Sequence, residues 1–376
     1  MKTYDLDHAA TTSLAPSVYE KMKPFLESSY GNPSSMHELG IHNKKVINQT
    51  KKGIAELLHC YYDELIFTGS GTESINLALK GYALRHPDKK EILITPIEHK
   101  ATLQATKFLQ GQGFKVLYLK IDEEGYIDLS DLRHKLSLST LMVSIIWANN
   151  EIGTIQHLEE IRRITSYHQV MLHVDAIQMI GHYPIHLKDL DVDMMSFSSH
   201  KFYGPKGIGL LYKKKDIEIE PLIHGGGQEF GFRSGTEAIH QIIGFYEALK
   251  YVHKDLHKKQ KKLNDQTKKL FMMIKKDHDV ILNGPSLNDQ RLPGLLSLSF
   301  KHKKGYELQY ALSKQGLYVS TGSACSNQDI EPSHVIKALE IPKIYADGTI
   351  RLSLGYDLKE EDLKEISRRF NMILSD

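Results

Sequence analysis

Lys201 lies in the stretch of sequence with the clearest potential for chemistry. It follows a strand-like run at residues 193–197 and the polar residues 198–200. It precedes a Gly- and Pro-rich turn at residues 204–207. A lysine amine can form a Schiff base with an aldehyde cofactor, and burial tunes its basicity. A surface lysine is the alternative. It is weakened here because the preceding run is expected to be buried and to end where ligands bind.

A glycine turn and a carboxylate could complete a cofactor site around Lys201. Residues 67–74 join an apolar strand to a helix start, where backbone N–H groups favour an anion, although a plain tight turn is the simpler alternative. The turn matches neither a Walker A motif nor a dinucleotide fingerprint. Asp175 follows another apolar run and could hold a ring nitrogen or a metal, or merely cap a helix. A phosphate cup, a carboxylate and a lysine together predict a pyridoxal phosphate (PLP) site.

Two further residues could act on a substrate. Cys325 lies in a small, polar, loop-like segment where a thiolate could be a nucleophile, although free cysteines are more often buried and inert. Arg351 lies in a late strand-like run and could clamp a carboxylate, or lie on an exposed sheet face. Cys60 is interpreted as core packing. The 20 His include no zinc-protease motif, and no metal site is predicted.

Alternating strands and helices position these residues. Apolar runs predict strands at residues 65–68, 91–95, 115–119, 141–147, 170–174 and 193–197, with helices such as 74–84 and 102–110 between them. Such alternation indicates a mostly parallel sheet that is covered on both faces. Residues 237–276 predict one long helix with a single buried stripe, and strands at 294–300, 317–320 and 349–354 predict a smaller α+β unit.

The composition excludes several classes of protein. The chain has 376 residues, of which 41% are hydrophobic and 25% charged, with a net charge of +2. These values exclude a disordered or fibrous chain and argue against nucleic acid as the main partner; the basic run at 258–262 is typical of a solvated helix face. No apolar run reaches about 18 residues, the length that a membrane span needs. Two cysteines and no signal core predict a cytoplasmic protein.

A series of short blocks occurs in an order that matches one family. The blocks are residues 31–35, 72–74, 98–100, 149–153, 173–178, 200–207, 225–229, 233–236 and 322–325, within a similarity that runs from Tyr4 to Gly355. The chain resembles PLP-dependent cysteine desulfurases of the NifS/IscS type, in the class V aminotransferase family. The resemblance implies an α/β protein of fold type I. We expect a large domain (15–255) with a mostly parallel seven-stranded sheet flanked by helices, and a small α+β domain (1–14 and 256–376).

The resemblance also implies a role for each site residue. Lys201 binds the cofactor and moves protons at the substrate Cα, His99 stacks on the ring as acid and base, and Cys325 accepts the substrate sulfur as a persulfide. Asp175 pairs with the ring nitrogen and Gln178 with the ring hydroxyl. The residues implied to hold PLP are Gly71, Thr72, His99, Asn150, Asp175, Gln178, Ser198, His200, Lys201 and Thr236, the last from a partner subunit. Those implied to bind the substrate are Asn150, Arg351 and Asn32.

The implied activity is a sulfurtransferase that converts L-cysteine to L-alanine in a homodimer, without direct nucleic-acid or membrane contact. The sulfur passes to an iron–sulfur scaffold or a tRNA-thiolation enzyme. The step from Cys325 to Glu331 resembles the longer-loop group, and the chain ends soon after its last helix, so we expect tRNA thiolation or a shortened cluster-assembly route. The alternatives are a selenocysteine lyase, another enzyme of the family, or a non-catalytic sulfur carrier, which the presence of both Lys201 and Cys325 disfavours.

Three positions depart from the family pattern. Ser199 stands where Gly is usual before His-Lys, the turn at 69–71 has an unusual Gly-Ser-Gly order, and Phe230 replaces a usual Arg. The first two change backbone freedom beside the phosphate cup, and the third could alter a subunit interface. None removes a chemical group that the implied mechanism needs.

Overall fold

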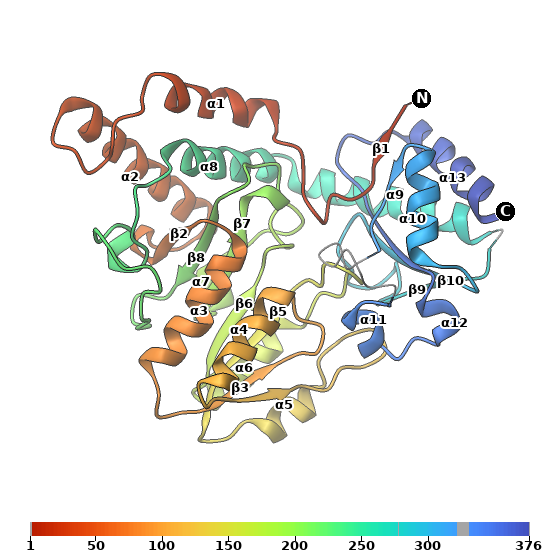
Figure 1. The fold of residues 1–376 in the computed structure, drawn as a ribbon, viewed down its shortest axis with the longest axis horizontal. Helices are drawn as coiled ribbons and strands as arrows, with labels where there is room; N and C mark the ends of the chain where they lie inside the picture. The colour runs from red at the N-terminus through yellow and green to blue at the C-terminus, as the bar shows by residue number, and fades with distance from the viewer. Residues whose placement is uncertain (1, 277, 322–330, 376) are drawn as a thin grey trace.

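The computed structural model of the chain describes residues 2–276, 278–321 and 331–375 (Figure 1). Its largest sheet has seven strands. Their spatial order is β2 (Leu65–Thr68), β8 (Gly209–Lys213), β7 (Met194–Ser198), β6 (Met171–Asp175), β5 (Thr140–Ile146), β3 (Glu91–Ile94) and β4 (Lys115–Tyr118). Within this sheet, β8 runs antiparallel to both neighbours and the other pairs are parallel. The mostly parallel seven-stranded sheet is confirmed, and β8 is the strand that the predicted series lacked.

Helices cover both faces of this sheet. One face carries α3 (Gly71–Arg85) and α4 (Lys100–Gly111), whose apolar side chains join one buried cluster. The other carries α1 (Pro16–Glu27), α2 (Glu38–Leu58), α5 (Leu129–Lys135), α6 (Leu158–Tyr167), α7 (Leu187–Leu190) and α8 (Ile239–His253), which join a second cluster. Because both faces are buried, the strands are apolar along their length and stand out in the sequence. We call this sheet with α1–α8 the large unit.

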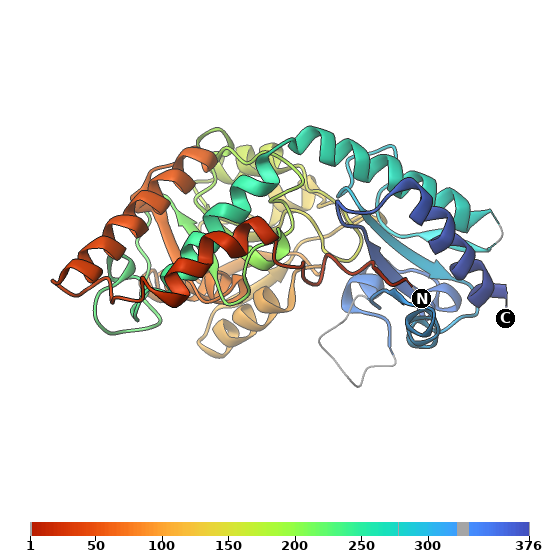
Figure 2. The ribbon, with the colours of Figure 1, turned by 90° about the horizontal axis from the view of Figure 1, so that it is seen from above.

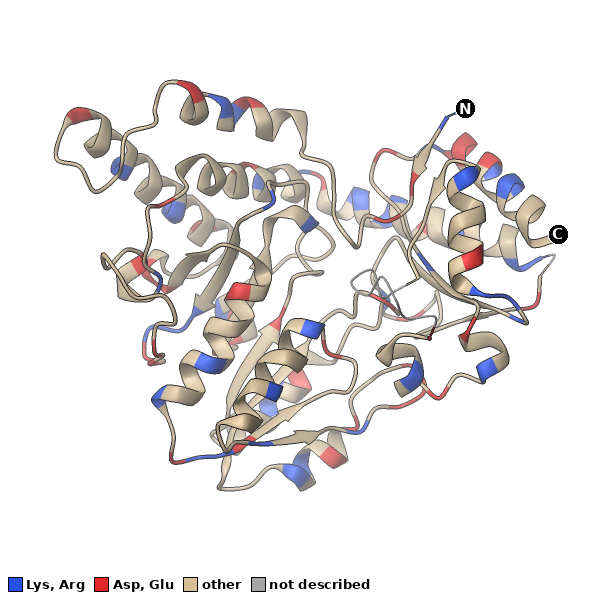
Figure 3. Ribbon diagram, in the orientation of Figure 1, with Lys and Arg blue, Asp and Glu red and all other residues tan. Residues whose placement is uncertain are grey.

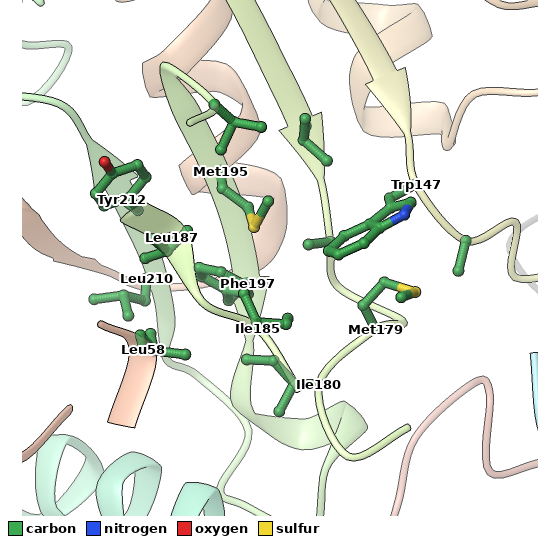
Figure 4. Packing of buried hydrophobic residues seen from close by; sticks show 14 of the residues in the cluster. Leu58, Trp147, Met179, Ile180, Ile185, Leu187, Met195, Phe197, Leu210 and Tyr212 are labelled. Carbon is green, nitrogen blue, oxygen red and sulfur yellow. The ribbon is translucent and has the colours of Figure 1, made fainter. Parts of the chain in front are cut away.

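Strand β7 shows how the two clusters hold the centre of the sheet. Its side chains alternate, with Met194 in the cluster under α3 and α4, and with Met195 and Phe197 in the opposite cluster. Figure 4 shows Met195 and Phe197 among side chains from β8 and the segment after β6, including Leu210 and Ile185. Burial of each such side chain contributes about 1.5–3 kcal/mol. The end of β7, which leads directly into Lys201, is therefore held in a rigid core.

A smaller α+β unit follows, as predicted. Its antiparallel sheet has the order β12 (Thr349–Ser353), β10 (Leu295–Phe300) and β9 (Val280–Leu282). Helices α9 (Leu256–Lys275), α10 (Gly305–Lys314) and α13 (Glu360–Ser375) pack on it, and α11 (His334–Ala338) and α12 (Lys343–Ala346) are short. The N-terminal strand also belongs to this unit, because β1 (Tyr4–Asp5) pairs in parallel with β11 (Leu317–Tyr318). We call β1 together with β9–β12 and α9–α13 the small unit.

The single long helix predicted over residues 237–276 is wrong. Helix α8 ends at His253 and α9 begins at Leu256. Asp255 between them has a φ of 57°, in the left-handed region that interrupts a helix. The apolar spacing from Val252 to Leu256 continues in phase across the break, so the pattern contained no signal for it. The break is where the chain leaves the large unit for the small one.

The surface carries both signs of charge. Figure 3 shows Lys and Arg interspersed with Asp and Glu over the outer helices of both units. In the described ranges, which omit residues 1, 277, 322–330 and 376, no helix is both long and apolar enough to cross a membrane.

Candidate active site

Lys201 ends a short 3₁₀ helix, η2 (Ser199–Lys201), directly after β7. Its Nζ donates hydrogen bonds to the carbonyl oxygens of Ala9 and Ala10, each at 2.7 Å. The same N-terminal segment is tied to the Lys201 turn through Thr12, whose backbone N and Oγ1 both donate to the His200 carbonyl. Lys201 therefore lies at the carboxyl end of the sheet, under the segment that joins the two units.

Asp175 and Gln178 converge on the same place from the end of β6. Asp175 is 3% exposed and accepts a hydrogen bond from the backbone N of Ile177 at 3.0 Å. Burial raises the pKa of the Asp175 carboxyl to about 6, against the opposing effect of the nearby Lys201 ammonium. Gln178 Nε2 donates to the Ala9 carbonyl at 2.9 Å, which Lys201 also contacts. A turn follows β6, so the helix-cap alternative for Asp175 is wrong.

A buried polar ladder lies behind Asp175. The two ring nitrogens of His173 contact Ser144 Oγ at 2.8 Å and Ser196 Oγ at 2.9 Å, joining β5, β6 and β7. Burial lowers the pKa of His173 to about 3, so the ring is neutral at pH 7. Both nitrogens have partners, and the ladder fixes the strands whose ends carry Asp175 and Ser198. His173 lies in the sequence block 173–178, but nothing in the sequence indicated a role for it.

The start of α3 forms a cup beside these groups. A Cβ on Gly71 would lie 2.4 Å from Ile177 Cδ1 and 3.1 Å from Ser198 Cβ, so a larger residue would require Ile177 and Ser198 to shift. Ser70 caps the helix by accepting from the Glu73 backbone N at 3.1 Å. The helix N-terminus favours an anion. Gly71 and Ser198 thus lie together, as the predicted phosphate cup requires, and Thr72 follows on the exposed side of the helix start.

His200 lies on η2 between Ser199 and Lys201. Its Nδ1 contacts Thr11 Oγ1 at 3.2 Å. Burial, together with the Lys201 and Lys206 charges, lowers the pKa of His200 to about 4. A neutral ring can still donate a hydrogen bond to a phosphate oxygen, so His200 is a suitable neighbour for the cup.

His99 is the cap residue of α4. Its Nδ1 accepts a hydrogen bond from the Ala101 backbone N at 3.1 Å. Because Nδ1 is the acceptor, the neutral ring carries its proton on Nε2. Burial first, and then the Lys201 ammonium, lower the pKa of His99 to about 4. At neutral pH the ring is therefore an uncharged donor.

Arg351 and Asn150 meet where the two units touch. Arg351 is 3% exposed, so the alternative of an exposed sheet face is wrong. Its Nη1 donates to the Asn150 carbonyl at 2.9 Å and its Nη2 to Asp7 Oδ1 at 2.6 Å. Within the described part of the chain, its buried Nε has no partner. The guanidinium is thus oriented by Asp7, a residue that the sequence did not single out.

Two predicted residues lie elsewhere, and a third is outside the described residues. Asn32 is exposed in the segment between α1 and α2, and Thr236 is exposed before α8. Figures 1 and 2 show the α1–α2 connection at the end of the molecule away from the small unit. Cys325 falls within 322–330, outside the described residues. Cys60 packs against the large-unit core, and burial raises the pKa of its thiol to about 12, which confirms the core-packing interpretation.

The convergent groups fit PLP. A buried carboxyl at the end of β6 suits a protonated ring nitrogen, the Gln178 amide suits the ring hydroxyl, and the Lys201 amine suits the aldehyde. The helix start at Gly71, with Ser198 and His200 nearby, suits the phosphate. Charges and donors therefore match the cofactor at each of its polar groups.

Comparisons with known proteins agree with this arrangement. A family model described as Aminotransferase class-V matches residues 4–366. The chain is 43% identical to "Cysteine desulfurase IscS" of Dictyoglomus turgidum, over 95% of this chain and 91% of that protein. It is 40% identical to the protein of the same name from Methanosarcina thermophila, over 97% and 90%. Among solved structures, "NIFS-LIKE PROTEIN" has a TM-score of 0.94 at 38% identity, covering 100% of both chains. "SspA in complex with cysteine" has a TM-score of 0.82 at 33% identity, covering 94% of this chain and 99% of that one.

Proposed function

The chain belongs to the aminotransferase class-V family, and we infer that it is a PLP-dependent cysteine desulfurase. It converts L-cysteine to L-alanine and transfers the sulfur. The similarity to proteins of that name covers nearly the whole chain, and a similar protein has been solved with cysteine bound. The observation that carries the proposal is the convergence of Lys201 and Gln178 on the Ala9 carbonyl beside buried Asp175.

When bound, PLP withdraws electrons from the substrate Cα. The chain's own residues control the protons. The residues that fit PLP, namely Gly71, Asp175, Gln178, Ser198, His200 and Lys201, are called the cradle. We propose that Lys201 Nζ removes and returns the proton at Cα, since it is the amine of the cradle. His99 donates a hydrogen bond from Nε2, because the Ala101 amide occupies Nδ1 and keeps that tautomer. The lowered pKa of His99 keeps the ring uncharged over the working pH range.

We propose that Arg351 binds the substrate carboxylate. Two of its nitrogens donate hydrogen bonds to Asn150 and Asp7, and these bonds fix the plane of the guanidinium group. Its Nε has no partner in the described residues. A charge-assisted hydrogen bond from a buried guanidinium is worth more than one at the surface. Asn150 lies beside it and is proposed to contact both cofactor and substrate.

Covalent geometry supports Cys325 as the sulfur acceptor. Ser320 pairs with Arg351 through backbone hydrogen bonds of 3.1 and 2.6 Å. Cys325 is five residues further along, and five extended residues span at most about 18 Å. The thiol is thus tethered to the residue proposed to bind the substrate. The Cys325 sulfur bonds to the substrate sulfur as the substrate C–S bond breaks, which leaves alanine and a persulfide.

The test is sulfide and alanine production from L-cysteine with a reductant, by the wild type and by Cys325→Ala. Equal sulfide and alanine from the wild type alone are expected, with the same cofactor absorbance in both proteins, because cofactor binding and sulfur attack use different residues. A wild type that binds cofactor but releases no sulfide would reject the desulfurase. The same assay with selenocysteine in place of L-cysteine tests the alternative that the protein is a selenocysteine lyase.

We propose that the enzyme acts as a homodimer, in which the partner subunit's Thr236 completes the phosphate cup. Thr236 and Asn32 both lie exposed on the large unit. Exposed large apolar side chains flank Asn32 in the sequence, namely Leu26, Tyr30, Met36, Leu39 and Ile41. The exposed Tyr62 and Phe230 rings contact each other with centroids 6.3 Å apart. Exposed apolar surface of this kind is typical of an interface. Sedimentation velocity with activity across a dilution series tests it, and a fully active monomer would reject it.

The sulfur acceptor is proposed to be a tRNA-thiolation enzyme or an iron–sulfur scaffold that serves a shortened assembly route. The spacing from Cys325 to Glu331 supports this choice. The test compares persulfide transfer to a thiouridylase and to a scaffold protein side by side, and equal transfer to both would remove its support. A cytoplasmic location stays a prediction from the cysteine content.

A further inference from the structure

Helix α11 (His334–Ala338) connects the segment that carries Cys325 to the large unit. His334 is nine residues after Cys325. The apolar side chains of α11 and the residue after it, Val335, Ile336 and Leu339, form a buried cluster with Ile97 and Ile152 of the large unit. Ile97 is two residues before His99, and Ile152 is two residues after Asn150. The helix therefore packs on both loops that carry predicted active-site residues.

Two polar contacts fasten the start of α11 to the same loops. His334 Nε2 lies 2.9 Å from the carbonyl oxygen of Glu98, the residue before His99. A carbonyl only accepts, so the ring nitrogen donates and carries the proton. The Ser333 side chain lies close to the Glu151 carboxyl, next to Asn150, and lowers its pKa. Each contact is thus one residue away from a group that the mechanism uses.

The region where α11 meets the two loops contains buried carboxyls, which make it rigid and sensitive to small movements. Glu98 is fully buried, and its Oε1 accepts from Thr95 Oγ1 at 2.6 Å and from the Ile146 backbone N at 2.9 Å. Burial raises the pKa of Glu98 to about 8, with a smaller contribution from the Asp175 charge, and it raises the pKa of Glu151 against the charges of His334, Arg351 and Lys100. Such groups tolerate little movement, because a shifted partner would leave a buried polar atom unpaired.

We propose that His334 is a positioning residue that holds the start of α11, which follows Cys325 in the chain by nine residues, on the loop that carries His99. Its N–H holds the start of α11 on the Glu98 carbonyl, one residue from His99. This rests on the proposed desulfurase activity. Loss of the N–H slows the step that needs Cys325 and leaves cofactor binding intact, since the amine, carboxyl and phosphate cup that fit PLP, at Lys201, Asp175 and Gly71, lie on η2, β6 and α3.

The test compares His334→Phe, which keeps a ring but loses the donor, with His334→Gln, which keeps an N–H donor. A misplaced reacting group costs on the order of 10- to 100-fold in rate. We expect His334→Phe to lower kcat for sulfide by about tenfold or more, with KM for L-cysteine and cofactor absorbance unchanged, and His334→Gln to restore most of kcat. His257→Phe, the same change on the exposed face of α9, is the matched control.

Hydrogen exchange of the peptide over residues 331–338 provides a second readout that does not depend on activity. Faster exchange in His334→Phe but not in His334→Gln supports the anchor, even if the wild type makes no sulfide and the proposed function fails. Equal exchange in both variants, or wild-type kcat in His334→Phe, overturns it. Equal loss of kcat in both variants also overturns it. If the Phe protein does not fold, His334→Asn, whose amide is one methylene shorter, is expected to show the same loss.

Discussion

Polar groups are held differently in two regions of the molecule, the carboxyl ends of β6 and β7 and the seam between the two units. The seam comprises Asp7, Glu98, Asn150, Glu151, His334 and Arg351. At the strand ends, the His173 ladder satisfies both ring nitrogens within one sheet. At the seam, Arg351, Glu98 and Glu151 each keep a buried polar atom without a partner in the described residues. The His173 ladder is therefore satisfied within one unit. The proposed substrate and sulfur steps depend on two units meeting.

The difference separates the proposed cofactor residues from the proposed sulfur-transfer residues. Strand ends in a buried parallel sheet are fixed by backbone hydrogen bonds and by packing on both faces. Groups at a seam are fixed by side-chain contacts, each worth about 0.5–1.5 kcal/mol net. Changes in the cradle are expected to abolish the reaction, and changes at the seam to tune it.

The largest expected effect is at the cradle. Lys201→Ala should abolish sulfide production, because it removes the amine that the cofactor and the substrate proton both need. The measurement is sulfide release beside the visible spectrum of the purified protein. Lys215→Ala, at a lysine that is exposed and paired with Asp63, is the control and should keep wild-type turnover. Activity in Lys201→Ala would place the reactive amine elsewhere.

Glu98→Gln tests the seam through pH. The folded state keeps the Glu98 proton up to a pKa of about 8, above the ordinary glutamate value of 4.5, so the unfolded state loses this proton first as pH rises. Wild-type stability should therefore fall relative to Glu98→Gln between about pH 5 and pH 8, by on the order of 3 kcal/mol, and then level. Gln keeps the oxygen that Thr95 and Ile146 contact.

Urea unfolding of both proteins at several pH values measures this difference. Wild-type and variant curves that stay parallel from pH 5 to pH 8 would mean that Glu98 ionises at its ordinary pKa. A constant offset between the curves carries no weight, because the added NH₂ of Gln can change stability at every pH equally.

Arg351→Lys should weaken substrate binding at the seam and leave the cradle unchanged. Lysine keeps the charge but cannot reproduce the planar set of donors. KM for L-cysteine is expected to rise by about 10- to 100-fold, corresponding to roughly 1.4–2.7 kcal/mol. Steady-state kinetics measure it, with the cofactor spectrum before substrate addition as the control. A fall in kcat alone would assign Arg351 to positioning instead.

The smallest expected effect compares two buried hydroxyls. Ser199 Oγ is buried without a partner in the described part of the chain, whereas Ser144 Oγ contacts His173. Ser199→Ala should stabilise the protein by about 1 kcal/mol, and Ser144→Ala should destabilise it by about 1–3 kcal/mol, because it leaves a buried nitrogen unpaired. Urea melts of both variants test this, and destabilisation by Ser199→Ala would show that its hydroxyl is satisfied.

Much of the large unit could be predicted from the sequence because its signals are local. Strands buried on both faces are continuous apolar runs, and Asp175 and Lys201 each follow one. Motif order then indicated the cofactor and the activity. The helix break at Asp255 escaped prediction because the apolar stripe stays in phase across it. Strand β8 also escaped, although its residues are all buried.

The sequence by itself determined which chemical groups the protein carries and on which kind of element each lies, because residue type and periodicity are properties of neighbouring positions. Only the tertiary structure decided which groups meet. The contacts of Arg351 with Asp7 and Asn150, and of His334 with Glu98, join residues more than 200 positions apart. The raised pKa values of Asp175 and Glu98 likewise come from burial, which depends on everything packed around them.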